Sequence, residues 1–219
     1  MPCAAYSTGA SGKQESGQNA SAMSDDQQEI AAQAARWVVE EGLEYSAAKR
    51  RAARQLGLHG RGALPSNELL EQAVSDYIAV FCADTQPQEL LALRRLALVW
   101  MERLDAFRPH LGGAVWHGTA TRNSDIYLQL FCDDSKSAEI ALIDQGVNYV
   151  PRAVTGFNGQ AVDALSVHAV CADLNEDIGV YLVIYDFDDV RGALKSDSKG
   201  RAPRGDAQAL RRLLQQVPA

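Results

Sequence analysis

The sequence is poor in cysteine and has no long apolar run. Its four cysteines form no Cys-x-x-Cys pair, and none has a histidine at metal-ligand spacing. This pattern predicts reduced, buried thiols rather than a disulfide framework or a zinc site. No segment reaches the ~18 apolar residues expected of a membrane span, and the N-terminus lacks a signal-peptide pattern. We therefore expect a cytoplasmic protein with no membrane partner.

Basic charge is also scarce. The chain has 21 Lys and Arg against 28 Asp and Glu, which gives a net charge of -7. An acidic chain does not favour non-specific binding to nucleic acid. The densest basic segment, residues 49–54, has no aromatic residues interleaved with its cations. We interpret it as the solvated face of an amphipathic helix, and nucleic acid is not an expected partner.

The first half of the chain has the periodicity of helices. Residues 1–25 are mostly small and polar and predict a disordered tail. Residues 26–107 place apolar residues at helical spacing in four stretches, which predicts a helical domain. In the third helix we expect Phe81 to be buried, and Thr85 is expected to cap the fourth.

From residue 108 onward the period changes. Apolar runs at 125–132 and 179–185 are typical of central strands. Residues 147–154 and 160–165 flank a glycine-rich turn and predict a hairpin, and 167–172 predicts a further strand. Helices are expected near 135–145 and 206–216. Helices followed by a mixed sheet with packed helices predict an α+β fold, with 108–219 as its second domain.

One segment of this second domain carries a recognisable chemical pattern. Residues 113–128 read Gly-Ala-Val-Trp-His-Gly-Thr-Ala-Thr-Arg-Asn-Ser-Asp-Ile-Tyr-Leu. This resembles the motif of the nucleotidyltransferase superfamily, close to G-S-x-A-x-G-x-x-x-x-x-S-D-h-D-h with h apolar. Gly113 and Gly118 match its two glycines, and Ser124-Asp125 matches its Ser-Asp pair. The resemblance covers about residues 108–132.

The resemblance implies a minimal nucleotidyltransferase-like domain that takes a nucleoside triphosphate. In that family a glycine-rich turn holds the phosphates, while carboxylates from neighbouring strands hold Mg²⁺. Carried over residue by residue, it implies that Asp125 is the catalytic carboxylate and a metal ligand. The residues that it places at the bound ligand are Gly113, His117, Gly118, Thr119, Arg122 and Ser124.

Three positions depart from the family pattern. Ala114 replaces the serine that follows the first glycine, and Tyr127 replaces the second carboxylate. In the later strand, Tyr181 stands where we expect the third carboxylate. Asp125 is then one carboxylate out of three, which supplies too few hard oxygen ligands for Mg²⁺.

Two alternatives remain open for Asp125. In a different register, Asp186 or Asp188 at the end of the later strand would join Asp125 in holding Mg²⁺. In the second alternative, Ser124 and Asp125 have no role in chemistry: they begin a buried strand, and Asp125 caps the preceding turn.

These observations lead to three hypotheses of function. The first is a catalytically impaired nucleotidyltransferase-fold protein that binds a nucleotide, or a protein partner through its helical domain. The second is an active enzyme that transfers a nucleoside monophosphate with Asp125 and either Asp186 or Asp188. The third is a structural or regulatory interaction protein without a nucleotide, in which the helical segment around Trp37 and Trp100 is the working surface.

Overall fold

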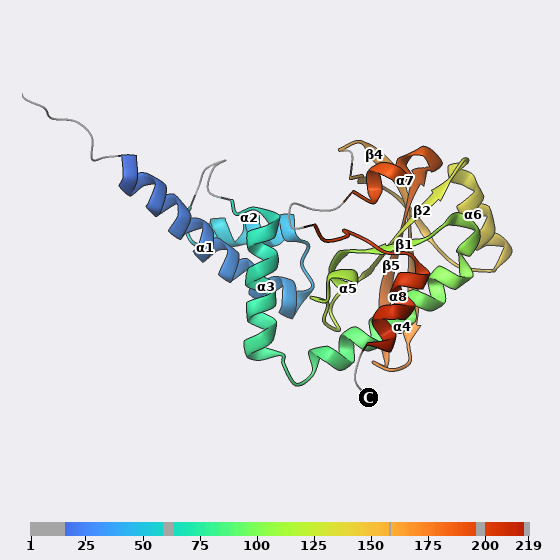
Figure 1. Ribbon diagram of the computed structural model, residues 1–219, viewed down its shortest axis with the longest axis horizontal. Helices are drawn as coiled ribbons and strands as arrows, with labels where there is room; N and C mark the ends of the chain where they lie inside the picture. The colour runs from blue at the N-terminus through green and yellow to red at the C-terminus, as the bar shows by residue number, and fades with distance from the viewer. Residues whose placement is uncertain (1–15, 59–63, 158, 196–199, 217–219) are drawn as a thin grey trace, which may run out of the picture.

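A helical N-terminal part precedes a mixed sheet in the computed structural model, which describes residues 16–58, 64–157, 159–195 and 200–216 (Figure 1). The predicted α+β fold is confirmed. The leading helices are α1 (Ser16–Glu41), α2 (Tyr45–Gln55), α3 (Asn67–Phe81) and α4 (Gln86–Arg103). The later helices are α5 (Gly113–His117), α6 (Ser135–Asp144), α7 (Val190–Ala193) and α8 (Ala207–Gln215), with short 3-10 turns η1 (Asp105–Phe107) and η2 (Phe187–Asp189).

The sheet has the strand order β1-β2-β5-β4-β3 within the described residues. Its strands are β1 (His110–Gly112), β2 (Ile126–Cys132), β3 (Val150–Thr155), β4 (Ala161–Cys171) and β5 (Glu176–Asp186). β2 and β5 pair in parallel, and the other neighbours are antiparallel. The stretches predicted as strands at 160–165 and 167–172 form the single strand β4, because β5 pairs with it without a break from Ala164 to Cys171.

The apolar side chains form two main cores, and their division differs from the predicted boundary at residue 107. The first core lies among α1, α2 and α3 and includes Ile30, Leu70 and Val74. The second joins α4 to the sheet, where Leu93 and Met101 of α4 pack in one cluster with β2 and β5. Figure 1 shows α1–α3 at one end of the molecule and α4 running beside the sheet. The apolar stripe of α4 therefore belongs to the second domain.

Some element ends also differ from expectation. α1 begins at Ser16, inside the predicted tail of residues 1–25, of which 1–15 lie outside the described residues. Ser66 caps α3 by accepting a hydrogen bond from the N–H of Leu69 at 3.1 Å. Thr85 makes no such side-chain bond to α4. Phe81 is 69% exposed because it is the last residue of α3, outside the core with α1.

The structure bears on two expectations, the absence of a membrane span and the burial of the cysteines. No helix among the described residues is long and apolar enough to cross a membrane. Cys171 is buried, whereas Cys82 and Cys132 are partly buried, and all three are free thiols. Cys3 lies outside the described residues. The prediction of buried thiols is therefore fully met only at Cys171.

Candidate functional site

The two glycines of the motif enclose a short helix rather than an open loop. Gly113 (φ 66°) begins α5, and Gly118 (φ 90°) ends it. Both lie in the left-handed region that glycine adopts without a steric penalty. The N–H of Gly118 donates to the carbonyl of Ala114 at 2.9 Å, which closes the turn.

Helix α5 and the polypeptide directly after it are held by two side chains of α4. Arg94 donates from Nε to the carbonyl of Val115 at 3.1 Å, and burial lowers the pKa of this arginine. The buried amide of Gln86 donates to the carbonyls of Gly118 and Ala120 at 3.0 and 2.8 Å. The carbonyls of Val115 and Gly118 accept no hydrogen bond within this short helix, and α4 supplies their donors, as it does for the carbonyl of Ala120. The motif segment is thus anchored to a helix that the motif does not contain.

The two side chains that were candidates for phosphate contact, His117 and Arg122, each lie beside a glutamate. His117 Nδ1 lies 3.1 Å from Oε1 of Glu71 on α3, and both side chains are largely covered. The guanidinium of Arg122 pairs with Glu176 on β5, and its backbone N–H donates to Glu89 at 3.0 Å. A phosphate that approached either side chain would therefore meet a carboxylate.

The hydroxyl residues of the motif face inward. Thr119 is only 9% exposed. Ser124 Oγ accepts from the N–H of Thr121 at 3.0 Å, while the N–H of Ser124 donates to the carbonyl of Thr121 at 2.8 Å. Ser124 thus closes a local turn. The assignment of both residues as ligand contacts stays a prediction.

Asp125 lies directly before β2 and is half-buried. Its carboxylate accepts a hydrogen bond from the N–H of Gly179 on β5. Burial raises the pKa of Asp125, the Gly179 N–H and nearby His168 act in the opposite direction, and Glu44 raises it further. The turn before β2 is closed by Ser124, and the hydrogen bond of the Asp125 carboxylate is made to Gly179 on the neighbouring strand.

Tyr127 and Tyr181 lie directly opposite each other on the parallel strands β2 and β5. Their rings stack with centroids 5.0 Å apart and an interplanar angle of 12°. The Tyr127 hydroxyl donates to Oε1 of Glu44 at 3.4 Å, and burial raises the pKa of Tyr127. The stacked pair fills the space where the resemblance expects the second and third carboxylates.

The predicted pairing of Asp125 with Asp186 or Asp188 is wrong. In the parallel register Ile126 lies opposite Val180, and Cys132 lies opposite Asp186. Six residues of strand at roughly 3.3 Å each separate the two ends by about 20 Å. Asp186 instead caps the turn that holds Asp188, whose N–H it accepts at 3.2 Å. Among the described residues, no three His, Cys, Asp or Glu side chains are grouped to hold a metal ion.

Other residues at this site could not be found from the motif. Glu44, Glu71, Gln86 and Arg94 all come from the helical part, and nothing in their spacing links them to residues 113–128. Two residues proposed for a working surface are also placed differently. Trp37 and Trp100 are only 6% and 5% exposed, so most of each ring lies in a core and neither forms a broad exposed surface.

The environment of Asp125 leads to a pH-dependent prediction. Because burial raises the folded-state pKa of this carboxyl, its ionisation opposes folding, and stability is lost as pH rises above the unfolded value of 3.8. Asp125→Asn keeps an acceptor for the Gly179 N–H without the charge. We expect the free energy of unfolding of Asp125→Asn, relative to wild type, to be higher at pH 7 than at pH 3.5. Urea unfolding of both proteins at the two pH values measures it.

Asp163→Asn is the matched control, because Asp163 is an exposed carboxylate on β4. Comparison of the two variants separates the effect of burying a carboxylate from the effect of removing one. If Asp125→Asn were instead less stable relative to wild type at pH 7 than at pH 3.5, the ionised carboxylate would be stabilised by a positive charge.

The chain was also compared with known proteins. No family model, no curated protein and no solved structure gives a significant match to this chain.

Proposed function

We propose that this chain is a nucleotidyltransferase-like protein that does not carry out metal-dependent transfer and acts as a binding protein for a protein partner. The observation that carries the proposal is the stacked pair of Tyr127 and Tyr181 on adjacent strands. In the nucleotidyltransferase pattern, carboxylates at these two positions would share an ion with Asp125. Aromatic rings supply none of the oxygen ligands that Mg²⁺ requires.

The remaining carboxylate supports the same conclusion. Asp125 accepts the N–H of Gly179, and burial favours its neutral form. Its neighbour Glu44 accepts a hydrogen bond from the hydroxyl of Tyr127 at 3.4 Å. A lone carboxylate in such a setting is a weak ligand for a hard divalent cation.

The charges around the motif favour a protein partner over a nucleotide. Glu176 neutralises Arg122, and Glu71 lies 3.1 Å from the imidazole of His117, the other side chain that would contact phosphate. A nucleoside triphosphate carries several negative charges and would have to displace both glutamates. The energy of those pairs would oppose binding rather than assist it.

Nucleotides should therefore leave the protein unchanged. We expect each of ATP, GTP, CTP and UTP, with Mg²⁺ or Mn²⁺, to leave the melting temperature of the wild-type chain within about 1 °C. A ligand at 100 times its Kd would stabilise the native state by about 2.7 kcal/mol, a shift of several degrees at this size. Metal-dependent transfer of label from an α-³²P nucleotide to any acceptor would overturn the proposal.

Restoring the carboxylates tests the resemblance itself. In the double variant Tyr127→Asp and Tyr181→Asp, like charges on facing strand positions should lower the melting temperature without metal. Mn²⁺ or Mg²⁺ should then recover several degrees by binding three carboxylates, whereas the Tyr127→Phe, Tyr181→Phe control should not respond. A folded double variant that is indifferent to both metals would count against the nucleotidyltransferase-like geometry and leave an unrelated interaction protein.

A further inference from the structure

Strand β4 has a free edge over its last five residues. β3 pairs with β4 only as far as Val150 opposite Ser166, whereas β5 continues to pair with β4 up to Cys171. Residues 167–171 therefore have a strand on one side and none on the other within the described chain. Their sequence, Val-His-Ala-Val-Cys, contains no proline and no Lys, Arg, Asp or Glu. Edge strands usually carry such residues, which block pairing with another strand.

The side chains of this edge alternate between two different surroundings. Val167 and Cys171 are buried in the core shared with α4. Val170 points to the other side of the sheet and is 75% exposed. A strand added along this edge would alternate in the same way, with every second side chain directed toward α4.

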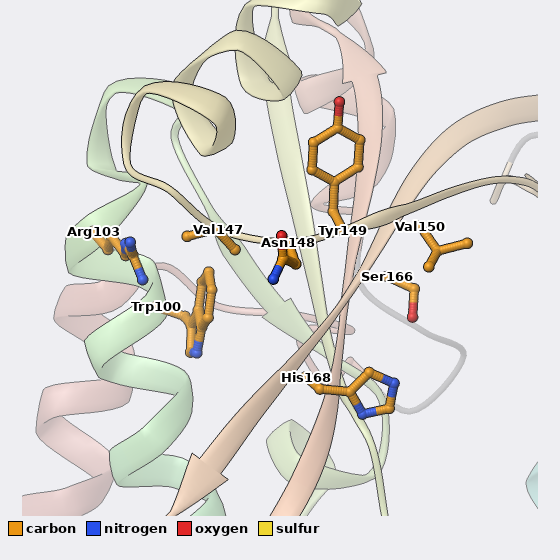
Figure 2. A pocket seen from close by; sticks show the side chains of 8 residues that line it. All are labelled: Trp100, Arg103, Val147, Asn148, Tyr149, Val150, Ser166 and His168. Carbon is orange, nitrogen blue, oxygen red and sulfur yellow. The ribbon is translucent and has the colours of Figure 1, made fainter.

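A cavity of about 420 Å³ lies on the α4 side of this edge. Figure 2 shows Trp100 and Arg103 on α4, the segment of residues 147–150 that enters β3, and His168 on β4 with its ring directed away from Trp100. A volume of this size is within the range of small-ligand pockets and suits one large apolar side chain. The free edge and the cavity are therefore parts of one surface.

Of the residues that line the cavity, Arg103 alone is a lysine or arginine, and His168 lies 3.6 Å from the carboxylate of Asp177. The Arg103 guanidinium lies 5.0 Å from the centre of the Trp100 ring and donates to the side-chain carbonyl of Gln145. In the part of the chain that the structure describes, no carboxylate lies within ion-pair distance of Arg103. A positive charge without its counter-ion at the cavity favours an anionic group on the occupant.

We propose that the edge of β4 at residues 167–171 and the adjoining cavity bind an extended peptide segment of a protein partner. Backbone hydrogen bonds to the edge hold the segment, an apolar side chain fills the cavity beside Trp100, and a carboxylate pairs with Arg103. Edge addition of this kind takes affinity from the main chain and specificity from pockets for alternate side chains. The inference rests on the proposed role as a binding protein and names the chemistry of the partner.

A second copy of the chain is a weaker candidate for the same edge. Pairing this edge with itself would place residues 167–171 opposite the same stretch of the other copy. That stretch contains no carboxylate to offer to Arg103. The charge at the cavity therefore favours a different, acidic partner.

The test is amide hydrogen exchange on the full ¹⁵N-labelled chain with a synthetic peptide, acetyl-Thr-Val-Thr-Leu-Thr-Val-Asp. We expect the edge-facing amides among residues 167–171 to exchange about tenfold more slowly with the peptide, and the indole N–H resonance of Trp100 to shift. A peptide N-methylated at alternate amides should give no protection, because it cannot donate to the edge.

Charge is tested with a pair of variants. Arg103→Gln should weaken binding of the acidic peptide about tenfold, as for loss of a hydrogen bond to a charged group, and should change little with a C-terminal lysine peptide. Arg95→Gln is the matched control, since Arg95 lies on the same helix but pairs with Asp173 at 3.2 Å. Equal weakening by both variants would overturn the role of Arg103.

Two results would overturn the proposal as a whole. One is unchanged exchange of residues 167–171 at millimolar peptide with the protein folded. The other is protection of these amides without peptide that increases with protein concentration, which would assign the edge to a second copy. Both are independent of the metal-dependent melting of the Tyr127→Asp, Tyr181→Asp variant, so failure here is distinguishable from failure of the proposed function.

Discussion

Gly205→Ala is expected to destabilise the protein by about 3 kcal/mol, at the upper end of the usual cost of overpacking. Gly205 forms an antiparallel bridge with Leu111 of β1, with backbone hydrogen bonds of 2.8 and 3.0 Å. A Cβ at this position would lie less than 3.0 Å from three carbons of the Trp116 indole. The indole cannot withdraw freely, because its Nε1 donates to the carbonyl of Ala202 at 2.8 Å. Either the ring or the bridge must therefore give way.

Urea unfolding of single and double variants measures this effect. Trp116→Leu removes the obstructing ring and has its own cost from lost packing. The double variant Gly205→Ala, Trp116→Leu should be more stable than the sum of the two single effects predicts, by about 1 kcal/mol or more. Additivity within about 0.5 kcal/mol would show that the ring and the bridge are not coupled.

Gly179→Ala is expected to cost about 2–3 kcal/mol and to disturb the candidate site directly. An added Cβ would lie less than 3.0 Å from Oδ1 of Asp125 and 3.4 Å from Cε2 of Tyr181. The carboxylate would have to move away from the N–H of Gly179, which would leave a buried donor without its partner. The stacking of Tyr181 on Tyr127 should loosen as well.

Thermal unfolding followed by near-ultraviolet circular dichroism reports both stability and the tyrosine environment. Gly192→Ala, in α7, is the matched control. A Cβ at this position would lie 3.5 Å from the Phe157 ring, which is an ordinary van der Waals contact. It should be neutral or stabilising by up to about 1 kcal/mol. Combining Gly179→Ala with Asp125→Ala should recover part of the loss. Equal effects of the two glycine variants would contradict the close approach of Asp125.

Much of the local structure was predictable, because it depends on spacing within a few residues. Leu70, Val74 and Ile78 recur at helical intervals and are buried along α3. Asp134 and Asp206 cap α6 and α8 with side-chain hydrogen bonds of 3.0 and 2.7 Å. In each case the side chain acts on backbone groups of the same turn, so the sequence pattern contains both partners.

The partners of an apolar stripe were not predictable in the same way. α4 has a stripe much like that of α3, yet Met101 packs with the sheet and Ile78 packs with α1 and α2. Burial of apolar surface is non-directional, so periodicity shows that a face is covered but not by what. This is why the packing of α4 with the sheet could not be predicted from its stripe.

The sequence by itself determined which chemical groups the candidate site contains. Gly113 and Gly118 supply the turn, and tyrosines stand at 127 and 181 in two strand-forming segments. Only the tertiary structure decided that Tyr127 faces Tyr181 and that Asp186 lies at the far end of β5. It also decided that the helical part, distant in sequence, supplies Glu44 and Glu71. The physical reason is strand register, which is set by long-range pairing and burial rather than by neighbours along the chain.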